Sequence, residues 1–154
     1  MARHNSKKLG WSARVTLALI VLLGTSQSYA ACLQSNLTGT WYFTGITGDT
    51  LLAEFWQTDS CKVKVNSTGK IVMSVSQCKF RDADGKRNFD IIGGKLAVNS
   101  SCRITGRIRF SDGVSSAYFN IDDARLDKGK TVFTMVGRLD IDPDIVSFYT
   151  GVKK

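Results

Sequence analysis

Residues 101–113 read SCRITGRIRFSDG, and this stretch decides the fold class of the chain. Apolar side chains alternate along it with polar and basic ones, at Cys102, Ile104, Ile108 and Phe110. A period of two is typical of a strand that buries one face. The Asp112-Gly113 pair that follows predicts a tight hairpin turn, because glycine takes a positive φ without steric cost.

The same pattern of short β-rich runs and turn residues continues over residues 39–152. No apolar spacing at i, i+3, i+4 and i+7 lasts for about ten residues, so no helix is predicted. The turn sequences are Gly48-Asp49, Ser67-Thr68-Gly69, Asp84-Gly85, Asp112-Gly113 and Lys128-Gly129. The predicted strands are 39–47, 51–57, 60–66, 70–81, 87–98, 101–110, 114–126, 131–139 and 145–152.

Eight or nine strands joined by tight turns predict an all-β domain with an antiparallel up-and-down meander. A meander of this length removes its exposed edges when it closes on itself. We therefore expect a closed barrel, with a two-sheet β-sandwich as the alternative.

The first 30 residues carry the pattern of a secretory signal peptide. A basic segment precedes the apolar run 15–24, and Ser28-Tyr29-Ala30 provides small residues at the cleavage positions. The run is about half the length that a transmembrane helix needs. The sequence therefore predicts a signal peptide over 1–30, a single domain over 31–154 and a periplasmic or secreted protein with no transmembrane span. Lipid attachment at Cys32 is the alternative.

All 4 cysteines follow the predicted cleavage site, at Cys32, Cys61, Cys78 and Cys102. An even number of cysteines in an exported domain predicts disulfides. Two bridges are expected, and all three pairings are open. The chain has no C-x-x-C pair, so a zinc site is not expected.

The histidine content and the net charge of the predicted mature chain exclude or disfavour several classes of function. The sole histidine, His4, lies in the predicted leader, which excludes a Ser-His-Asp triad or a His-ligated zinc from the mature chain. Residues 31–154 hold 17 basic and 13 acidic side chains. This mild excess in an exported domain does not predict nucleic-acid binding.

The segment NLTGTWY, residues 36–42, resembles the opening G-x-W strand of calycin barrels, the group of lipocalins and avidins. The resemblance implies a closed barrel in which Gly39 and Trp41 are structural and pack beneath the core. The leader, this start and the spaced S-C-x-[VI] segments also resemble small exported bacterial β-domains of unassigned function. That likeness implies a fold and a compartment only.

Two of the predicted strands present basic side chains on the face opposite the apolar one. These side chains are Lys62, Lys64, Arg103, Arg107 and Arg109. If the two strands lie near each other, the five form a basic stripe that could hold an anionic envelope or extracellular partner. A solvated barrel exterior is the simpler interpretation.

Acidic side chains suggest two further candidate sites. Asp140, Asp142 and Asp144, like Asp82 and Asp84, gather carboxylates at alternate positions, as calcium loops do, although turn aspartates bonding their own backbone explain both.

Glu54 is the single glutamate after the leader, and an inward side chain there could serve as a catalytic acid. An outward Glu54 is the expected arrangement, and enzyme activity is not predicted.

The aromatic residues of the predicted strands could line a cavity or fill the barrel. The best hypothesis is an exported, non-enzymatic binding protein without a cofactor, which holds a small apolar ligand inside or a partner outside. The alternative is an interaction or inhibitory module that uses the basic stripe over a filled core. Sequons begin at Asn36, Asn66 and Asn99.

Overall fold

The structure is a computed structural model and describes residues 31–154. The predicted signal peptide, residues 1–30, lies outside the described residues. Within the part that is described, no helix combines the length and the apolar character needed to cross a membrane.

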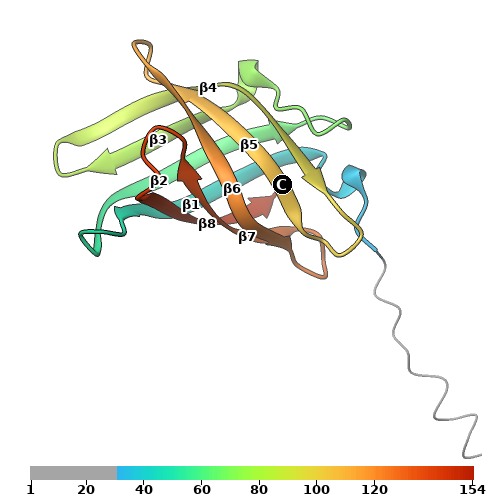
Figure 1. Ribbon diagram of the computed structural model, residues 1–154. Coiled ribbons are helices and arrows are strands. Elements are labelled where there is room, and N and C mark those ends of the chain that lie inside the picture. Colours follow the sequence, from blue (N-terminus) through green and yellow to red (C-terminus); the bar gives the residue numbers. More distant parts are fainter. Residues whose placement is uncertain (1–30) are drawn as a thin grey trace, which may run out of the picture. The chain divides into compact units, whose positions relative to one another are not determined.

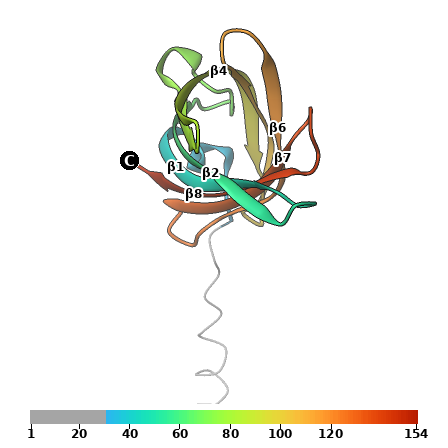
Figure 2. The ribbon, with the colours of Figure 1, turned by 90° about the vertical axis from the view of Figure 1, so that its left-hand side faces the viewer.

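Eight antiparallel strands close into one barrel in the order of the sequence (Figures 1 and 2). β1 pairs with β8, so the sheet has no free edge. The predicted all-β meander and closed barrel are confirmed, and the β-sandwich alternative is wrong. The strands are β1 (Gly39–Asp49), β2 (Glu54–Val65), β3 (Gln77–Asp82), β4 (Gly85–Val98), β5 (Ile104–Ser111), β6 (Ser116–Leu126), β7 (Val132–Leu139) and β8 (Ile145–Lys153).

Some predicted strand boundaries are wrong. The predicted strands 51–57 and 60–66 merge into the single strand β2, because residues 57–60 pair with β1 instead of turning, while residues 51–53 form the turn before it. The predicted strand 70–81 shrinks to β3. Residues 66–76 form isolated bridges to β2 and β4 and contain the short 3-10 helix η2 (Met73–Val75). β5 begins at Ile104 because Cys102 has a positive φ of 65° in the preceding turn.

Inward glycines make room for aromatic rings in the core. A Cβ at Gly151 would lie 2.3 Å from the Phe133 ring, and one at Gly137 would lie 2.5 Å from the Phe119 ring. Phe133 in turn packs on Phe43, with ring centroids 4.9 Å apart. Large and small inward residues thus interdigitate across neighbouring strands, which gives a close-packed core.

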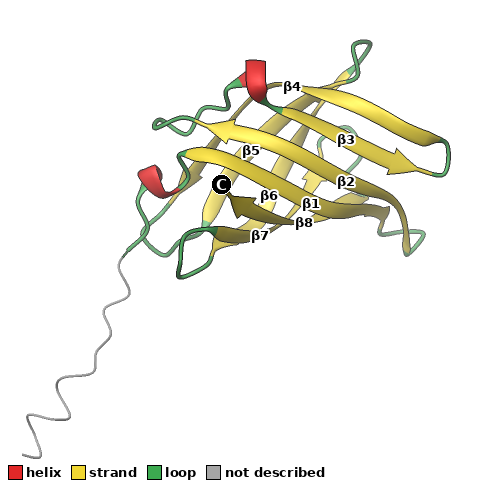
Figure 3. Ribbon diagram, turned by 180° about the vertical axis from the view of Figure 1, so that it is seen from behind, coloured by secondary structure: helices red, strands yellow, loops and turns green. Residues whose placement is uncertain are grey.

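One end of the barrel is closed by the segment that precedes β1. The short 3-10 helix η1 (Gln34–Asn36) and η2 lie at this end (Figure 3). Trp41 is 1% exposed, and its indole N–H donates to the carbonyl of Leu37 over 2.8 Å. Lys153 donates to the carbonyl of Asn36 and lies 5.7 Å from the Trp41 ring. Trp41 and Leu37 therefore form the floor of the closed end.

The four cysteines form two disulfides, as predicted. Cys32 is bonded to Cys102, which ties the segment before η1 to the turn before β5. Cys61 is bonded to Cys78, its direct partner across β2 and β3. The first bond uses the Cys32 sulfur, which lipid attachment would need to be free.

Candidate functional site at the barrel mouth

The end opposite Trp41 is open. Because the strands are antiparallel, the connections after β1, β3, β5 and β7 all lie at this end, the mouth (Figure 1). A cavity of about 260 Å³ opens there, and every one of the eight strands contributes to its lining. Figure 2 looks toward this end. The walls of the cavity therefore surround it on all sides.

Aromatic rings dominate one side of the mouth cavity. Phe80 on β3 lies 4.5 Å from the Phe89 ring on β4 and 6.0 Å from the Phe110 ring on β5, measured between centroids. Trp56 joins them because the register of β1 and β2 shifts between Thr47 and Gly48. Such a bulge changes the direction of a side chain. Ala117, Leu139 and Ile145 complete an apolar wall.

Polar side chains form the base of the cavity. Thr47 and Gln57 line it, and both donate to Asp59, which lies one inward position deeper on β2. Gln57 reaches Oδ1 of Asp59 over 2.6 Å, and the Thr47 hydroxyl reaches Oδ2 over 2.5 Å. The Tyr149 hydroxyl also donates to Oδ2, over 2.8 Å. Ser147 lies 2.7 Å from the Thr47 hydroxyl, so the five side chains form one connected polar cluster.

A missing side chain on β1 makes this cluster possible. Gly45 pairs with both Asp59 and Tyr149, on opposite sides of β1. A Cβ at Gly45 would lie 2.4 Å from the Tyr149 ring. Because Gly45 has no side chain, the Tyr149 ring can lie over β1 and bring its hydroxyl to Asp59.

The cluster holds its ionisable groups in unusual environments. Burial raises the pKa of Asp59, although the hydrogen bonds from Thr47, Tyr149 and Gln57 favour the charged form and oppose this. Burial, followed by the nearby Asp59 charge, raises the pKa of Tyr149 well above 10.0. Asp59 is 4% exposed and is surrounded by neutral donors. Perturbed groups beside a cavity are typical of functional sites.

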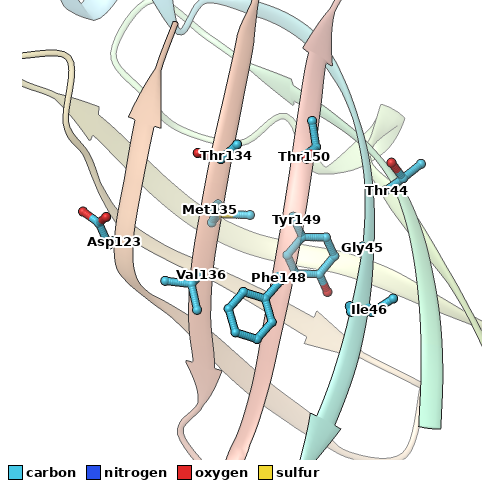
Figure 4. A pocket seen from close by; sticks show the side chains of 10 residues that line it. All are labelled: Thr44, Gly45, Ile46, Asp123, Thr134, Met135, Val136, Phe148, Tyr149 and Thr150. Carbon is cyan, nitrogen blue, oxygen red and sulfur yellow. The ribbon is translucent and has the colours of Figure 1, made fainter. Parts of the chain in front are cut away.

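A second hollow, of about 620 Å³, lies on the outer surface over β1, β8 and β7 (Figure 4). Figure 4 shows two cross-strand rows, one of Thr44, Thr150 and Thr134 and the other of Ile46, Phe148 and Val136. This furrow is lined by neighbouring strands of a single sheet and has no opposite wall. It can contact a surface, whereas the mouth can enclose a molecule.

The predicted basic stripe does not form as expected. β3 and β4 lie between β2, which carries Lys62 and Lys64, and β5. The β5 arginines instead contact β6: the guanidinium of Arg107 lies 4.2 Å from the Tyr118 ring, and Arg109 donates to the Ser116 hydroxyl over 3.0 Å. Arg103 pairs with Asp123 over 3.5 Å. The condition that the two strands lie near each other is not met.

The remaining predicted site residues lie apart from the polar cluster. Glu54 is exposed at the start of β2. Asp142 accepts the amide of Asp144, as a turn aspartate does, whereas Asp140 accepts the amide of Tyr118 on β6. Within residues 31–154, no three acidic or cysteine side chains converge to hold a metal ion. The calcium candidate at Asp140, Asp142 and Asp144 is therefore not supported.

Asp59 is not among the site residues that the sequence predicts. The predicted strands leave residues 58–59 as a break, so the sequence does not show which face of the sheet these two side chains occupy. Extending the alternation of Cys61 and Val63 back toward the start of β2 would have placed Asp59 and Gln57 on the inward face. A single carboxylate among the apolar inward residues of this strand is the sequence feature that could have identified Asp59 as a candidate site residue.

The chain was also compared with known proteins. No protein-family model and no curated protein matches it.

Proposed function

We propose that this protein is an exported, non-catalytic binding protein that holds one small molecule in the mouth of its barrel. The observation that carries the proposal is a cavity walled by all eight strands over a buried polar cluster. Concave, mostly apolar sites with a few convergent polar groups are typical of small-ligand binding.

The shape of the cavity supports a compact ligand with two chemically different ends. The apolar wall of Trp56, Phe80 and Phe110 suits a ring or short alkyl body. Thr47 and Gln57 at the base suit a polar group. An eight-stranded barrel has an interior wide enough for side chains or for one small ligand, and a cavity of about 260 Å³ accommodates only a small one.

The compartment is part of the proposal. Two disulfides fit an oxidising environment, so we infer that the protein acts in the periplasm or outside the cell. The alternative function, an interaction module with a basic stripe, has less support because β3 and β4 separate its two halves.

Fluorescence of the neutral probe N-phenyl-1-naphthylamine tests the proposal in the mature protein. Ala117→Phe places a ring in the mouth, and Thr150→Phe places the same ring in the outer furrow. We expect Ala117→Phe to weaken probe binding by about tenfold or more and Thr150→Phe to leave it unchanged. Circular dichroism verifies that both variants fold.

The opposite pattern, with Thr150→Phe weakening the binding and Ala117→Phe leaving it unchanged, would place the ligand in the furrow. Equal affinities in all three proteins would also contradict the proposal, and so would a parent protein that binds neither this probe nor smaller phenyl compounds.

A further inference from the structure

The charges of residues 31–154 are separated along the barrel axis. The four mouth connections, with the strand ends that flank them, are 49–54, 82–87, 111–116 and 139–145. These segments hold eight acidic side chains against two basic ones, Lys86 and Arg87. The acidic residues are Asp49, Glu54, Asp82, Asp84, Asp112, Asp140, Asp142 and Asp144.

The closed end has the opposite charge. The connections and the terminus there are 66–76, 99–103, 127–131 and 152–154. They hold one acidic residue, Asp127, against six basic ones, Lys70, Arg103, Lys128, Lys130, Lys153 and Lys154. Since like charges gather at each end, the mouth presents a negative field to an approaching solute, and such a field attracts cations.

A buried carboxylate, Asp59, lies beneath the mouth cavity and also favours a cation there. The three side-chain partners of Asp59 are Thr47, Gln57 and Tyr149, which are all neutral. The ion pairs Arg87–Asp82, Arg103–Asp123 and Arg138–Asp122 do not include it. A buried carboxylate without a cation is costly, and a cationic partner reduces that cost.

Two acceptor atoms at the base of the mouth can take a further hydrogen bond. Oδ1 of Asp59 receives one side-chain hydrogen bond, from Nε2 of Gln57, and a carboxylate oxygen can accept two. The Gln57 amide donates through its nitrogen, which leaves its carbonyl oxygen as an acceptor. Arg87, the basic residue that lines the mouth, already donates to Asp82.

The aromatic wall of the mouth cavity is a third feature that attracts a cation. The rings of Trp56, Phe80, Phe89 and Phe110 line the cavity. The face of an aromatic ring attracts a cation within about 6 Å of its centroid, and the attraction grows when water is excluded. The acidic mouth connections, the buried Asp59 carboxylate and the aromatic wall therefore all favour a positively charged ligand.

We propose that the mouth selects an organic amine: a compact apolar body carrying one ammonium group, which enters first and donates to the carbonyl oxygen of Gln57, with the Asp59 carboxylate directly behind that amide. This inference rests on the proposed function, because it names the ligand class of the same cavity. It predicts discrimination between molecules of equal size that differ only in charge.

Isothermal titration calorimetry of the mature protein at pH 7 tests the inference with three matched probes, 2-phenylethylamine, 2-phenylethanol and 3-phenylpropionate. We expect the amine to bind about tenfold or more tightly than the alcohol, and the carboxylate to bind most weakly. Asp59→Asn should weaken amine binding by about tenfold or more and leave alcohol binding unchanged. Asp90→Asn, which removes an equal charge from the exposed surface of β4, is the control and should change neither.

The outcomes separate the two proposals. If the alcohol binds as tightly as the amine, or if Asp59→Asn leaves the preference intact, the amine inference is overturned and the mouth remains an apolar site. If N-phenyl-1-naphthylamine binds but the amine does not, the inference is overturned in the same way. If neither the naphthylamine probe nor any phenyl probe binds, the proposed function fails and the inference fails with it.

Discussion

Asp59 is the buried acid of the polar cluster beneath the mouth cavity. Its carboxylate lies in the barrel interior, where three neutral donors offset only part of the lost hydration. Fold stability alone would favour an apolar side chain at this depth. The proposed amine site would give this buried acid a role, because its charge lies directly behind Gln57 at the base of the cavity.

The raised pKa of Asp59 predicts how stability changes with pH. Because the folded state holds this proton more tightly than the unfolded chain, unfolding releases a proton at pH values between 3.8 and the raised pKa of the folded state. The free energy of unfolding contributed by Asp59 therefore falls as pH rises from 3.8 to the folded pKa and then levels off. In Asp59→Asn this contribution is absent.

Urea titrations of both proteins between pH 3.5 and pH 8 measure the effect, because the other titrating groups are common to both and cancel. We expect the parent protein to lose stability relative to Asp59→Asn as pH rises. A difference that stays constant with pH, or that changes in the opposite direction, would show that the Asp59 pKa is not raised.

Gly45 predicts a steric effect at the same site. Gly45→Ala should destabilise the protein by about 1–3 kcal/mol, because the new Cβ would lie 2.3 Å from the Phe148 carbonyl oxygen and 2.4 Å from the Tyr149 ring. Gly93→Ala on β4 is the matched control, since the nearest atom to its Cβ would be 4.0 Å away. Chemical denaturation gives both values. Equal effects of the two substitutions would refute the role of Gly45 in seating Tyr149.

At the scale of the elements, the closed-end turns share one construction. Asn66, Asn99 and Asp127 each accept the backbone amides two and four residues further on. In each turn the residue three positions on has a positive φ: 82° at Gly69, 65° at Cys102 and 60° at Lys130. Asn66 and Asn99 are thus internal acceptors of their turns, a structural role separate from the sequon prediction.

Asn99 tests this construction. Asn99→Ala removes the acceptor for the Ser101 amide, the Ser101 hydroxyl and the Arg103 amide, and should cost about 1–2 kcal/mol. Asn99→Asp keeps an acceptor, as Asp127 does in its turn, and should change stability by less than about 0.5 kcal/mol. Thermal unfolding distinguishes them. If the aspartate variant loses as much as the alanine variant, the acceptor is not what stabilises the turn.

The elements also show which features of the fold could be predicted from sequence. Alternation in β5 and the Asp112-Gly113 turn identified a strand and a hairpin correctly, because both signals are local. The continuity of β2 through Asp59 could not be recognised locally, since it depends on pairing with β1. The mouth cavity depends on all eight strands and on the bulge that directs Trp56 inward, so no single stretch predicts it.

At the scale of the whole molecule, the two ends of the barrel differ in construction. The floor of Trp41 and Leu37, the Cys32–Cys102 bridge and the capped turns stabilise the closed end. The mouth instead exposes apolar tips, with Leu51 76% exposed and Ile141 70% exposed. Binding sites are commonly carried by loops on a rigid scaffold, and the site we propose at the mouth fits that division.

The two disulfides predict a difference in whole-chain stability. The Cys32–Cys102 bridge spans 70 residues and the Cys61–Cys78 bridge spans 17. Longer loops restrict the unfolded chain more, so replacing the first pair by alanine should cost about 1 kcal/mol more than replacing the second. Denaturant unfolding of the two double variants measures this. A larger loss on removing Cys61–Cys78 would mean that local packing outweighs chain entropy.

The proposed binding site at the mouth can be located directly in solution. The most direct test is an NMR titration of the ¹⁵N-labelled mature protein with 2-phenylethylamine, following the backbone amides of every strand. We predict saturable shifts at the mouth ends of all eight strands and at Asp59, with the closed-end turns and the furrow residues Thr134 and Thr150 unaffected. Shifts confined to the furrow, or spread over the acidic loops without saturation, would contradict it.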